Sequence, residues 1–235
     1  MALHYTDQEK KLLKKFLVFL LFIILFINIL LIYNSSKYRI SQIFIENLAY
    51  QNLTNEFLLD SFGHSIWTIS ESTFDSIIDK YDELEGIEVR KNYPNQLSIQ
   101  LIETRKMAVI LDFRKSTPET LLLLKNASLI PYSDQVTKDL TSVTITNGPV
   151  PESFYGELVS FIATLDNDYL LFIKSELTFS GNNLVGNLQG TVVDFGYPID
   201  LGKKASAIKY FLQNNSCQGE VRFIGSEEFI ADCNI

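Results

Sequence analysis

The sequence predicts an α+β protein with a single N-terminal transmembrane helix followed by two compact domains. Three observations lead to this fold class. An uncharged apolar run lies near the N-terminus. After it the chain predicts a strand, two helices and two strands. In the longer remainder, short apolar strands outnumber two helical stretches. With 235 residues the chain is long enough for two domains that each have a core.

The apolar run at positions 16–33 reads FLVFLLFIILFINILLIY and has no charge and one polar member, Asn28. As a helix it covers about 27 Å, close to the thickness of a bilayer's hydrocarbon core. A signal-peptide core is shorter, about 7 to 15 residues, and a small-residue cleavage site follows it. We therefore expect a retained span. Asn28 fits either a hydrogen bond to another span or passive tolerance within the membrane.

The charges around this run predict its orientation and exclude one class of partner. Without the four lysines, Asp7 and Glu9 of the tail at 1–15, the 20 basic and 28 acidic residues of the chain leave 16 and 26. Lysines that flank a span favour the cytoplasmic side, so the large acidic part is expected outside. An acidic exterior argues against nucleic acid as a partner.

The first external domain, expected at 38–106, combines strands with two short helices. Apolar residues alternate in two of its strands and recur at helical spacing after Ser70 or Ser72. In order, we expect a strand at Tyr38–Leu48, a helix capped by Thr54 that carries Phe57, Leu58 and Phe62, a helix that carries Phe74, Ile77, Ile78 and Tyr81, and strands at Ile87–Lys91 and Leu97–Ile102 joined through Tyr93-Pro94-Asn95.

The second external domain, expected at 107–235, is rich in mostly antiparallel strands and has two helices. Strands are expected at Met107–Phe113, Thr120–Leu124, Ser128–Tyr132, Tyr169–Phe179, Asn183–Leu188, Thr191–Phe195, Gly219–Ile224 and Glu228–Asp232, with Gly181, Gly186 and Gly190 in hairpins. A helix is expected at Glu152–Leu165, with Pro151 in the first turn and a buried apolar stripe of Phe154, Leu158, Phe161, Ile162 and Leu165, and an amphipathic helix is expected at Lys203–Leu212.

No pattern in the sequence predicts catalysis. The histidines are His4, in the tail, and His64, in a predicted loop, so an external triad or zinc site would have to be built around His64 alone. No glycine-rich phosphate loop is present, and Glu227-Glu228 is typical of a solvated turn. We expect a protein that is not an enzyme, with no cofactor, no metal and no small-molecule substrate.

The stretch VRKNYPNQLSIQLIETRKMAVI carries a resemblance to a known family. It is similar to the pattern V-R-R-x-W-P-x-x-L-x-I-x-V-x-E-R-x-P-V-A, which ends the POTRA domain of the bacterial division proteins FtsQ and DivIB. The positions in register are Val89, Arg90, Lys91, Tyr93, Pro94, Leu97, Ile99, Leu101, Glu103 and Ala108. The chain departs from the pattern at Met107, where the family has Pro, and at Asn47, where it has Gly.

The resemblance implies a POTRA domain (β-α-α-β-β), a second β domain and a scaffold role at the division septum in the cytoplasmic membrane. It implies binding to FtsB/DivIC-like and FtsL-like coiled-coil proteins, by strand addition to the C-terminal hairpin. The residues it implies at that interface are Arg222, Phe223, Gly225, Ser226, Phe229, Ile230 and Ala231. Without the resemblance, Phe223 and Ile230 fit equally well in the core of an ordinary closing hairpin. Glu103 and Arg105 are expected to alternate along the last strand of the first domain, with both side chains on one face. The resemblance implies that they fix the hinge between the domains, and the alternative is an ordinary exposed pair.

Cys217 and Cys233 lie symmetrically about residue 225. If Gly225-Ser226 forms a turn, they lie opposite each other at the open end of a hairpin, where a disulfide is possible outside the cytoplasm. Two unpaired buried cysteines explain the sequence equally well.

Two other functions remain open. The alternative within the same fold is a membrane-anchored POTRA protein that binds extended polypeptides in protein export or envelope assembly. A receptor or sensor for a small ligand would need a pocket that the sequence does not demand.

Overall fold

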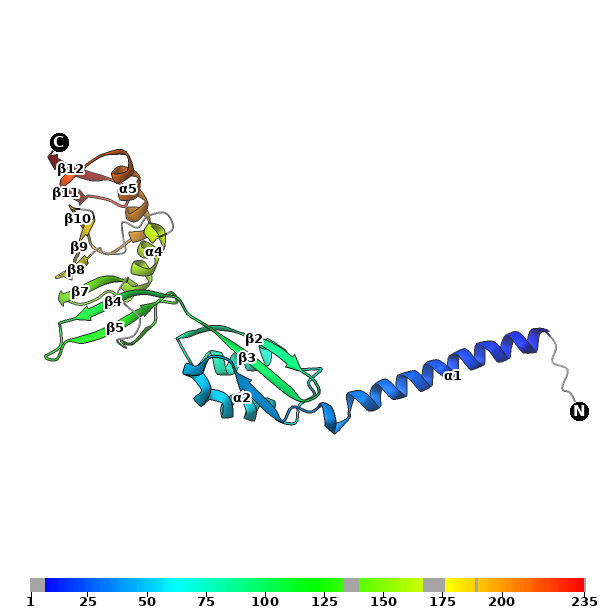
Figure 1. Cartoon of the computed structure of the whole chain (residues 1–235). Helices are drawn as coiled ribbons and strands as arrows, with labels where there is room; N and C mark the ends of the chain where they lie inside the picture. The colour runs from blue at the N-terminus through cyan, green and yellow to red at the C-terminus, as the bar shows by residue number, and fades with distance from the viewer. Residues whose placement is uncertain (1–6, 133–139, 167–175, 189, 235) are drawn as a thin grey trace, which may run out of the picture. The chain divides into compact units, whose positions relative to one another are not determined.

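The computed structural model describes residues 7–132, 140–166, 176–188 and 190–234. The chain is α+β, with one N-terminal apolar helix and a large mixed sheet (Figure 1). It divides into unit 1, Met1–Ile102, and unit 2, Glu103–Ile235, so the division falls four residues before the domain boundary expected from the sequence. His4 and the first part of the expected strand Tyr169–Phe179 lie outside the described residues.

Helix α1 (Asp7–Tyr33) contains the apolar run. From Lys11 to Tyr33 it is long and apolar enough to cross a membrane. The side-chain amide of Asn28 donates a hydrogen bond to the carbonyl oxygen of Ile24 at 2.8 Å. One N–H of the Asn28 amide is therefore satisfied inside its own helix, which lowers the cost of placing this side chain in the hydrocarbon core of a bilayer.

The rest of unit 1 is a three-stranded sheet with short helices. Its elements are η1 (Ser36–Tyr38), β1 (Gln42–Ile45), η2 (Leu48–Leu53), α2 (Thr54–Ser61), η3 (Glu71–Phe74), α3 (Asp75–Ile78), β2 (Leu84–Asn92) and β3 (Gln96–Glu103). The strand order is β1-β3-β2, and β1 runs parallel to β3 with Ile43 opposite Leu97. Alternate residues of each strand face one side, where they pack on the rings of Phe57 and Phe74, whose centroids lie 5.2 Å apart.

Several expectations for unit 1 were wrong in detail. The second helix is not continuous from Ser70 to Tyr81, because η3 and α3 together end at Ile78. Ser, Thr and Asp crowd this stretch, and their side chains compete for backbone hydrogen bonds. The first strand has four residues instead of eleven. Phe62 follows α2 and is exposed. The sequence leaves either Tyr38–Leu48 or Leu97–Ile102 as an exposed edge at which a partner could bind, and the structure places Leu97–Ile102 in the middle of the sheet.

Asn47, at the position where the family pattern has Gly, has an ordinary extended backbone with φ −76°. The substitution therefore requires no left-handed conformation. Its side chain instead continues the pairing of β1 with β3, because Oδ1 accepts from the backbone N–H of Leu101 at 2.9 Å and Nδ2 donates to the Leu101 carbonyl at 3.2 Å.

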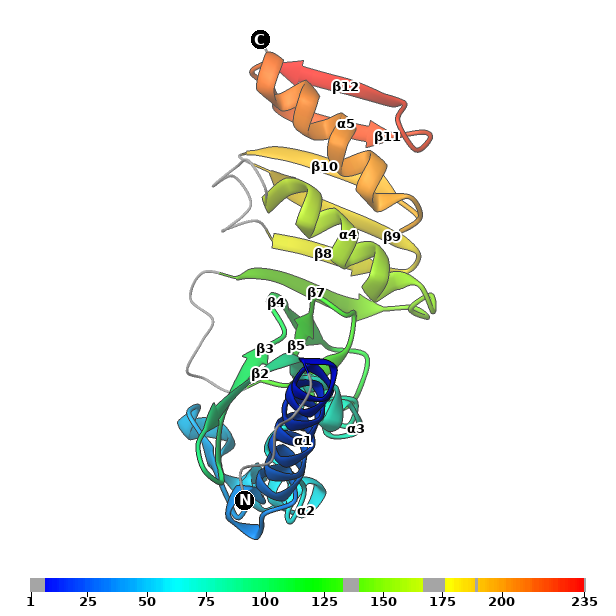
Figure 2. The ribbon, with the colours of Figure 1, turned by 90° about the vertical axis from the view of Figure 1, so that its right-hand side faces the viewer.

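Unit 2 is one nine-stranded mixed sheet with the order β12-β11-β10-β9-β8-β7-β4-β5-β6. Its strands are β4 (Lys106–Asp112), β5 (Glu119–Leu124), β6 (Leu129–Pro131), β7 (Thr141–Asn147), β8 (Glu176–Ser180), β9 (Asn183–Leu188), β10 (Thr191–Gly196), β11 (Gln218–Phe223) and β12 (Phe229–Asn234). Helices α4 (Phe154–Asp166) and α5 (Leu201–Asn214) pack side by side over one face of the sheet (Figure 2).

The core of unit 2 lies between this face and the two helices. The apolar stripe expected on the first helix is buried, and it consists of Phe154, Leu158, Phe161, Ile162 and Leu165. Its rings pack on the sheet: Phe154 lies 4.9 Å from Phe179 and Phe161 lies 4.9 Å from Phe195, between ring centroids. Helical spacing of apolar residues thus places α4 on the sheet as expected.

Two features of unit 2 were not expected from the sequence. Strand β7 was missed. It lies between β4 and β8, parallel to both, and buries Val143 and Ile145. Gly186 was assigned to a hairpin, but it lies within β9. A Cβ atom there would come within 2.6 Å of the Leu177 side chain, so the glycine makes room for close packing on the core face.

A pinned edge strand as the candidate functional site

Strand β12 forms one edge of the large sheet. Its inner side pairs antiparallel with β11, which runs parallel to β10 on its other side. Within the described part of the chain, no strand pairs with the outer side of β12. An edge strand presents a row of backbone donors and acceptors to any extended chain beside it.

The register shows which backbone groups point outward. The N–H of Ile224 donates to the carbonyl of Glu228 at 3.0 Å, which makes this a hydrogen-bonded pair. Pairs alternate along an antiparallel ladder. Ile230, opposite Arg222, and Asp232, opposite Glu220, therefore bond to β11. The N–H and C=O groups of Phe229, Ala231 and Cys233 point to the open edge.

The turn end of the hairpin is fixed to the start of α5. The backbone N–H of Gly225 donates to the Glu228 carbonyl at 3.2 Å. The hydroxyl of Ser226 donates to Oδ2 of Asp200 at 2.7 Å, and this bond is the main cause that lowers the pKa of the Asp200 carboxyl. Gly225 and Ser226, both predicted at the partner interface, thus form the turn of the hairpin and fix its position.

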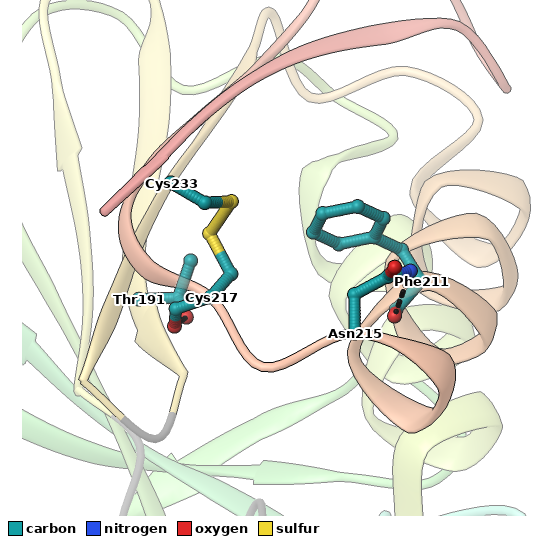
Figure 3. Close-up of a disulfide and its surroundings, with 5 residues drawn as sticks. All are labelled: Thr191, Phe211, Asn215, Cys217 and Cys233. Atoms are coloured by element: carbon teal, nitrogen blue, oxygen red, sulfur yellow. Dashed lines mark hydrogen bonds between the residues drawn. A yellow bond between two sulfur atoms is a disulfide. The ribbon is translucent and has the colours of Figure 1, made fainter. Parts of the chain in front are cut away.

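The opposite end of the hairpin is closed by a disulfide. The sulfur atoms of Cys217 and Cys233 lie 1.99 Å apart, with 4.9 Å between the Cα atoms (Figure 3). The pairing is diagonal, because Gly219 is the residue opposite Cys233 and the hairpin is centred on residue 226 instead of 225. The hydroxyl of Thr191 donates to the Cys217 carbonyl at 2.6 Å and ties the same end to β10.

Gly219 lets the two strands approach at this end. A Cβ atom there would lie 2.0 Å from the carbonyl oxygen of Asp232, within the backbone of β12. No side chain fits without moving the edge strand, because backbone atoms cannot swing aside. Since the turn and the disulfide fix both ends, β12 is held in its extended conformation before any partner binds.

The helix-side face of the hairpin belongs to the core, and this corrects one expectation. Phe223 is only 8% exposed and stacks on Phe195 at 5.6 Å, so it cannot fill a slot on a partner. Phe229 is half-buried and packs edge-on against Phe211 of α5 at 5.1 Å. Phe211 and Asn215 lie across from the disulfide in Figure 3, where the Asn215 amide donates to the Phe211 carbonyl at 3.0 Å.

A groove of about 600 Å³ runs between α5 and the hairpin. Phe229 and Phe211 contribute apolar surface, and Tyr210 is exposed beside them. Lys203 and Glu227 add one charge of each sign. The remaining lining residues are Ser206, Ala207 and Asn215. The groove was not predicted from the sequence, although Tyr210 on the polar side of a predicted amphipathic helix was the available signal.

Helix α5 is held in place by a buried lysine. The Lys204 ammonium donates to the carbonyl of Phe195 in β10 at 2.7 Å and to that of Tyr197, just after β10, at 2.9 Å. Burial lowers the pKa of this ammonium, and the nearby carboxyls of Asp200 and Glu157 act in the other direction. Since these bonds fix the helix to the sheet, they also fix the wall of the groove.

The opposite face of the hairpin is open. Arg222 lies between two carboxylates, at 2.9 Å from Glu220 and 3.7 Å from Asp194. Ile230, opposite Arg222, is 62% exposed, and Ile224 is exposed at the end of β11. An isoleucine beside an open backbone edge gives this face an apolar contact surface.

The seven residues predicted at the partner interface thus lie in different environments. Ile230 and Ala231 are exposed on the edge strand, and Arg222 is exposed one strand inward. Phe229 faces the groove. Phe223 is in the core, while Gly225 and Ser226 shape the turn.

The two residues named for a hinge lie at the start of unit 2. Glu103 ends β3, and Arg105 lies in the two-residue connection to β4, so they do not alternate along one strand as expected. The Glu103 carboxylate lies 3.7 Å from the Lys106 ammonium. The Arg105 carbonyl accepts from the N–H of Lys125 at 2.8 Å, which fixes the backbone of the connection to unit 2.

The described residues contain no group of three or more His, Cys, Asp or Glu side chains that could hold a metal ion. His64 is exposed in the loop after α2. No protein-family model matches the chain, and no curated protein resembles it significantly.

Proposed function

We propose that the chain is a membrane-anchored, non-enzymatic scaffold of the bacterial division septum, related to FtsQ and DivIB. In this proposal α1 anchors the chain in the cytoplasmic membrane, and the acidic remainder lies outside. The partner is an FtsB/DivIC-like protein paired with an FtsL-like one. An extended segment of that partner adds to the sheet at β12.

The observation that carries this proposal is the unpaired outer edge of β12, a strand that is fixed at both ends by the turn and the disulfide. The outward groups of Phe229, Ala231 and Cys233 offer three N–H donors and three carbonyl acceptors in a row. A strand that adds here gains main-chain hydrogen bonds whatever its sequence. Because the Cys217–Cys233 disulfide and the Ser226–Asp200 bond already order the hairpin, little further conformational entropy is lost on binding.

The two faces of β12 select the partner's side chains. Side chains alternate along an added strand. One set lies beside Ile230 on the open face, and the other beside Phe229 and Tyr210 at the groove. We expect apolar residues in both sets, with an aromatic or long aliphatic side chain in the groove. Main-chain bonds then supply affinity, and these contacts supply specificity.

Two further observations support the family assignment. In unit 1, a strand, short helices and two strands follow one another in the order that the POTRA assignment requires. Helix α1 is long and apolar enough to be the anchor that precedes it. The match of Val89 to Ala108 with the family pattern remains the most specific sequence support.

The test is the substitution Ala231→Pro. It removes one outward N–H and places a ring where the partner's backbone would lie, while the ladder to β11 uses the neighbouring residues Ile230 and Asp232. We expect the detergent-solubilised full chain to bind a co-expressed FtsB/FtsL-like pair at least about tenfold more weakly, as the loss of one to two hydrogen bonds predicts.

Ala231→Ser is the matched control, because it keeps the N–H and nearly the size of the side chain. Equal binding by both variants would rule out strand addition at this edge. Binding of many unrelated unfolded polypeptides, with no preference for the septal pair, would instead favour the export or envelope-assembly alternative.

A further inference from the structure

One end of unit 1 is formed by three segments that meet where the chain leaves the apolar helix. They are residues 34–41, 61–68 and 91–96, and we call them the tether end. Backbone hydrogen bonds join them: Ile66 donates to Tyr38 at 2.9 Å, Ile40 to His64 at 2.9 Å, and Ser41 to Asn95 at 3.1 Å. Distant parts of the sequence thus form one surface.

This surface carries an aromatic cluster at the margin of the core, against which Tyr38 packs. The ring of Trp67 lies 5.5 Å from Tyr38 and 4.8 Å from Tyr93, between centroids. Trp67 is 41% exposed and Tyr93 54%. Phe62, in the same segment as Trp67, is 63% exposed. Several large exposed rings on one small surface indicate a binding face.

The charge of the tether end is opposite to that of the rest of the molecule. Its three segments contain no Asp or Glu and carry Lys37, Arg39 and Lys91. All ten acidic residues between positions 34 and 102 lie outside them, in a chain whose net charge is −8. Arg39 and Lys91 also hold the surface together, through the carbonyls of Gly63 at 2.8 Å and Trp67 at 3.4 Å.

The tether to the apolar helix limits how far this surface can lie from a membrane. Helix α1 ends at Tyr33, and Tyr38 is five residues later. Five residues span at most about 17 Å when fully extended, and η1 (Ser36–Tyr38) shortens this stretch. If α1 crosses a bilayer, the aromatic cluster is therefore confined to the neighbourhood of the headgroups.

We propose that the tether end binds the outer surface of the bilayer in which α1 is anchored. The rings of Tyr38, Trp67 and Tyr93 lie in the headgroup layer, where amphipathic aromatic side chains are stable. Lys37 and Arg39 bind anionic headgroups. The inference rests on the membrane anchor of the proposed function and adds a second contact, which holds unit 1 against the membrane.

Trp67 is the one tryptophan of the chain, so its emission reports this contact directly. The full chain is reconstituted into bilayers that contain anionic lipid and a spin-labelled lipid, with the label either on the headgroup or deep in the acyl chain. We expect the headgroup label to quench Trp67 strongly, the deep label to quench it less, and soluble iodide to reach it poorly. Full quenching by iodide with none by either label would overturn the inference.

Charge variants test the electrostatic part. Lys37→Glu should lower the headgroup quenching several-fold in anionic bilayers and change it little in neutral ones. Lys80→Glu is the matched control, since Lys80 lies outside the three segments of the tether end and pairs with Glu56 in the first turn of α2. Equal quenching by both variants would contradict the role of anionic lipid.

Flotation of the same samples distinguishes a failure of the membrane anchor from a failure of the membrane contact at the tether end. A chain that does not float with the bilayers lacks the anchor, which contradicts both the proposed function and this inference. A chain that floats but shows no headgroup quenching keeps its anchor and contradicts this inference alone.

Discussion

Gly219 shows how a single missing side chain sets the geometry of the edge. A Cβ atom would lie 2.0 Å from the Asp232 carbonyl oxygen, which belongs to the backbone of β12 and cannot rotate away. We expect Gly219→Ala to lower the free energy of unfolding by roughly 1–3 kcal/mol, the usual cost of overpacking. Chemical denaturation of unit 2 measures this change.

Gly156→Ala is the matched control for that substitution. Gly156 lies in helix α4 with nothing within 4 Å of its would-be Cβ, and alanine is about 1 kcal/mol more favourable than glycine inside a helix. The control should be neutral or stabilising. A Gly219→Ala variant as stable as the control would mean that the two strands are not as close as described.

Asp112 gives unit 2 a defined response to acid. It is buried at the end of β4 and accepts from Nε and an Nη of Arg114 at 2.9 and 2.6 Å. The side-chain hydrogen bond from Arg114 lowers the carboxyl pKa below its usual 3.8. In the unfolded chain this carboxyl therefore protonates at higher pH than in the folded one. Its stabilisation is complete above about pH 4 and is lost as the pH falls through the lower folded-state pKa.

We expect Asp112→Asn to reduce stability at pH 7 by about 2 kcal/mol, because the charged hydrogen bonds to Arg114 are lost. The variant should also lose stability less steeply below pH 4. Unfolding curves recorded between pH 2 and 7 test both points. Asp232→Asn, at an exposed position of β12, should leave stability at pH 7 nearly unchanged, and an identical acid response in Asp112→Asn and the unaltered chain would refute the account.

At the scale of single elements, the β11–β12 hairpin depends on its disulfide. Cys217 and Cys233 are 16 residues apart in sequence, and a loop of that length gives about 3 kcal/mol of stabilisation when cross-linked. The double substitution Cys217→Ser and Cys233→Ser should lower the free energy of unfolding by up to this amount. It should also weaken partner binding, because the edge strand is then ordered only by its turn and its ladder.

Denaturation and binding assays without reductant measure both effects. The unaltered chain treated with reductant gives a second sample in which the Cys217–Cys233 disulfide is absent. If neither the variant nor the reduced chain loses stability, the disulfide does not hold the edge strand.

The sequence predicted some elements well for physical reasons. The uncharged run within α1 and the five buried residues of α4 follow from hydrophobic length and helical spacing, which depend on few neighbours. Strand β7 was missed because only Val143 and Ile145 of its seven residues are buried apolar side chains. Its assignment depends on the parallel neighbours β4 and β8, which are distant in sequence and invisible to local patterns.

The candidate site was predictable only in part. Alternation in β11 and β12 located the hairpin, but its centre lies at residue 226 instead of 225. Each cross-strand partner is therefore displaced by two residues, and Cys233 lies opposite Gly219 instead of Cys217. The sequence does not show which face of the hairpin α5 covers, and this decides whether Phe223 points to a partner or to the core. The groove beside Tyr210 depends on the packing of α5 against β12. Lys204 holds α5 in place through the carbonyls of Phe195 in β10 and Tyr197 just after it.

At the scale of the whole molecule, the proposal assigns separate tasks to the parts of the chain. The anchor and the tether end hold unit 1 at the membrane, and unit 2 offers an edge strand to a partner. A fluorescent fusion of the full chain in its own host should therefore form a band at midcell. The Ala231→Pro fusion should insert into the membrane to the same level, but the FtsB/FtsL-like proteins should no longer accumulate at midcell.

The microscopy needs Ala231→Ser beside Ala231→Pro, so that a loss of the partners can be traced to the backbone N–H. An even signal around the envelope for the unaltered chain would contradict the septal assignment, whatever the variants do.

Strand addition at β12 is tested most directly by amide hydrogen exchange of the full chain, followed residue by residue by NMR, with and without the septal partner. The account predicts that the amides of Phe229, Ala231 and Cys233 exchange fast in the free chain and become protected in the complex. The amides of Ile230 and Asp232, which already bond to β11, should change little. A complex that forms with full affinity while those three amides continue to exchange fast would contradict the account.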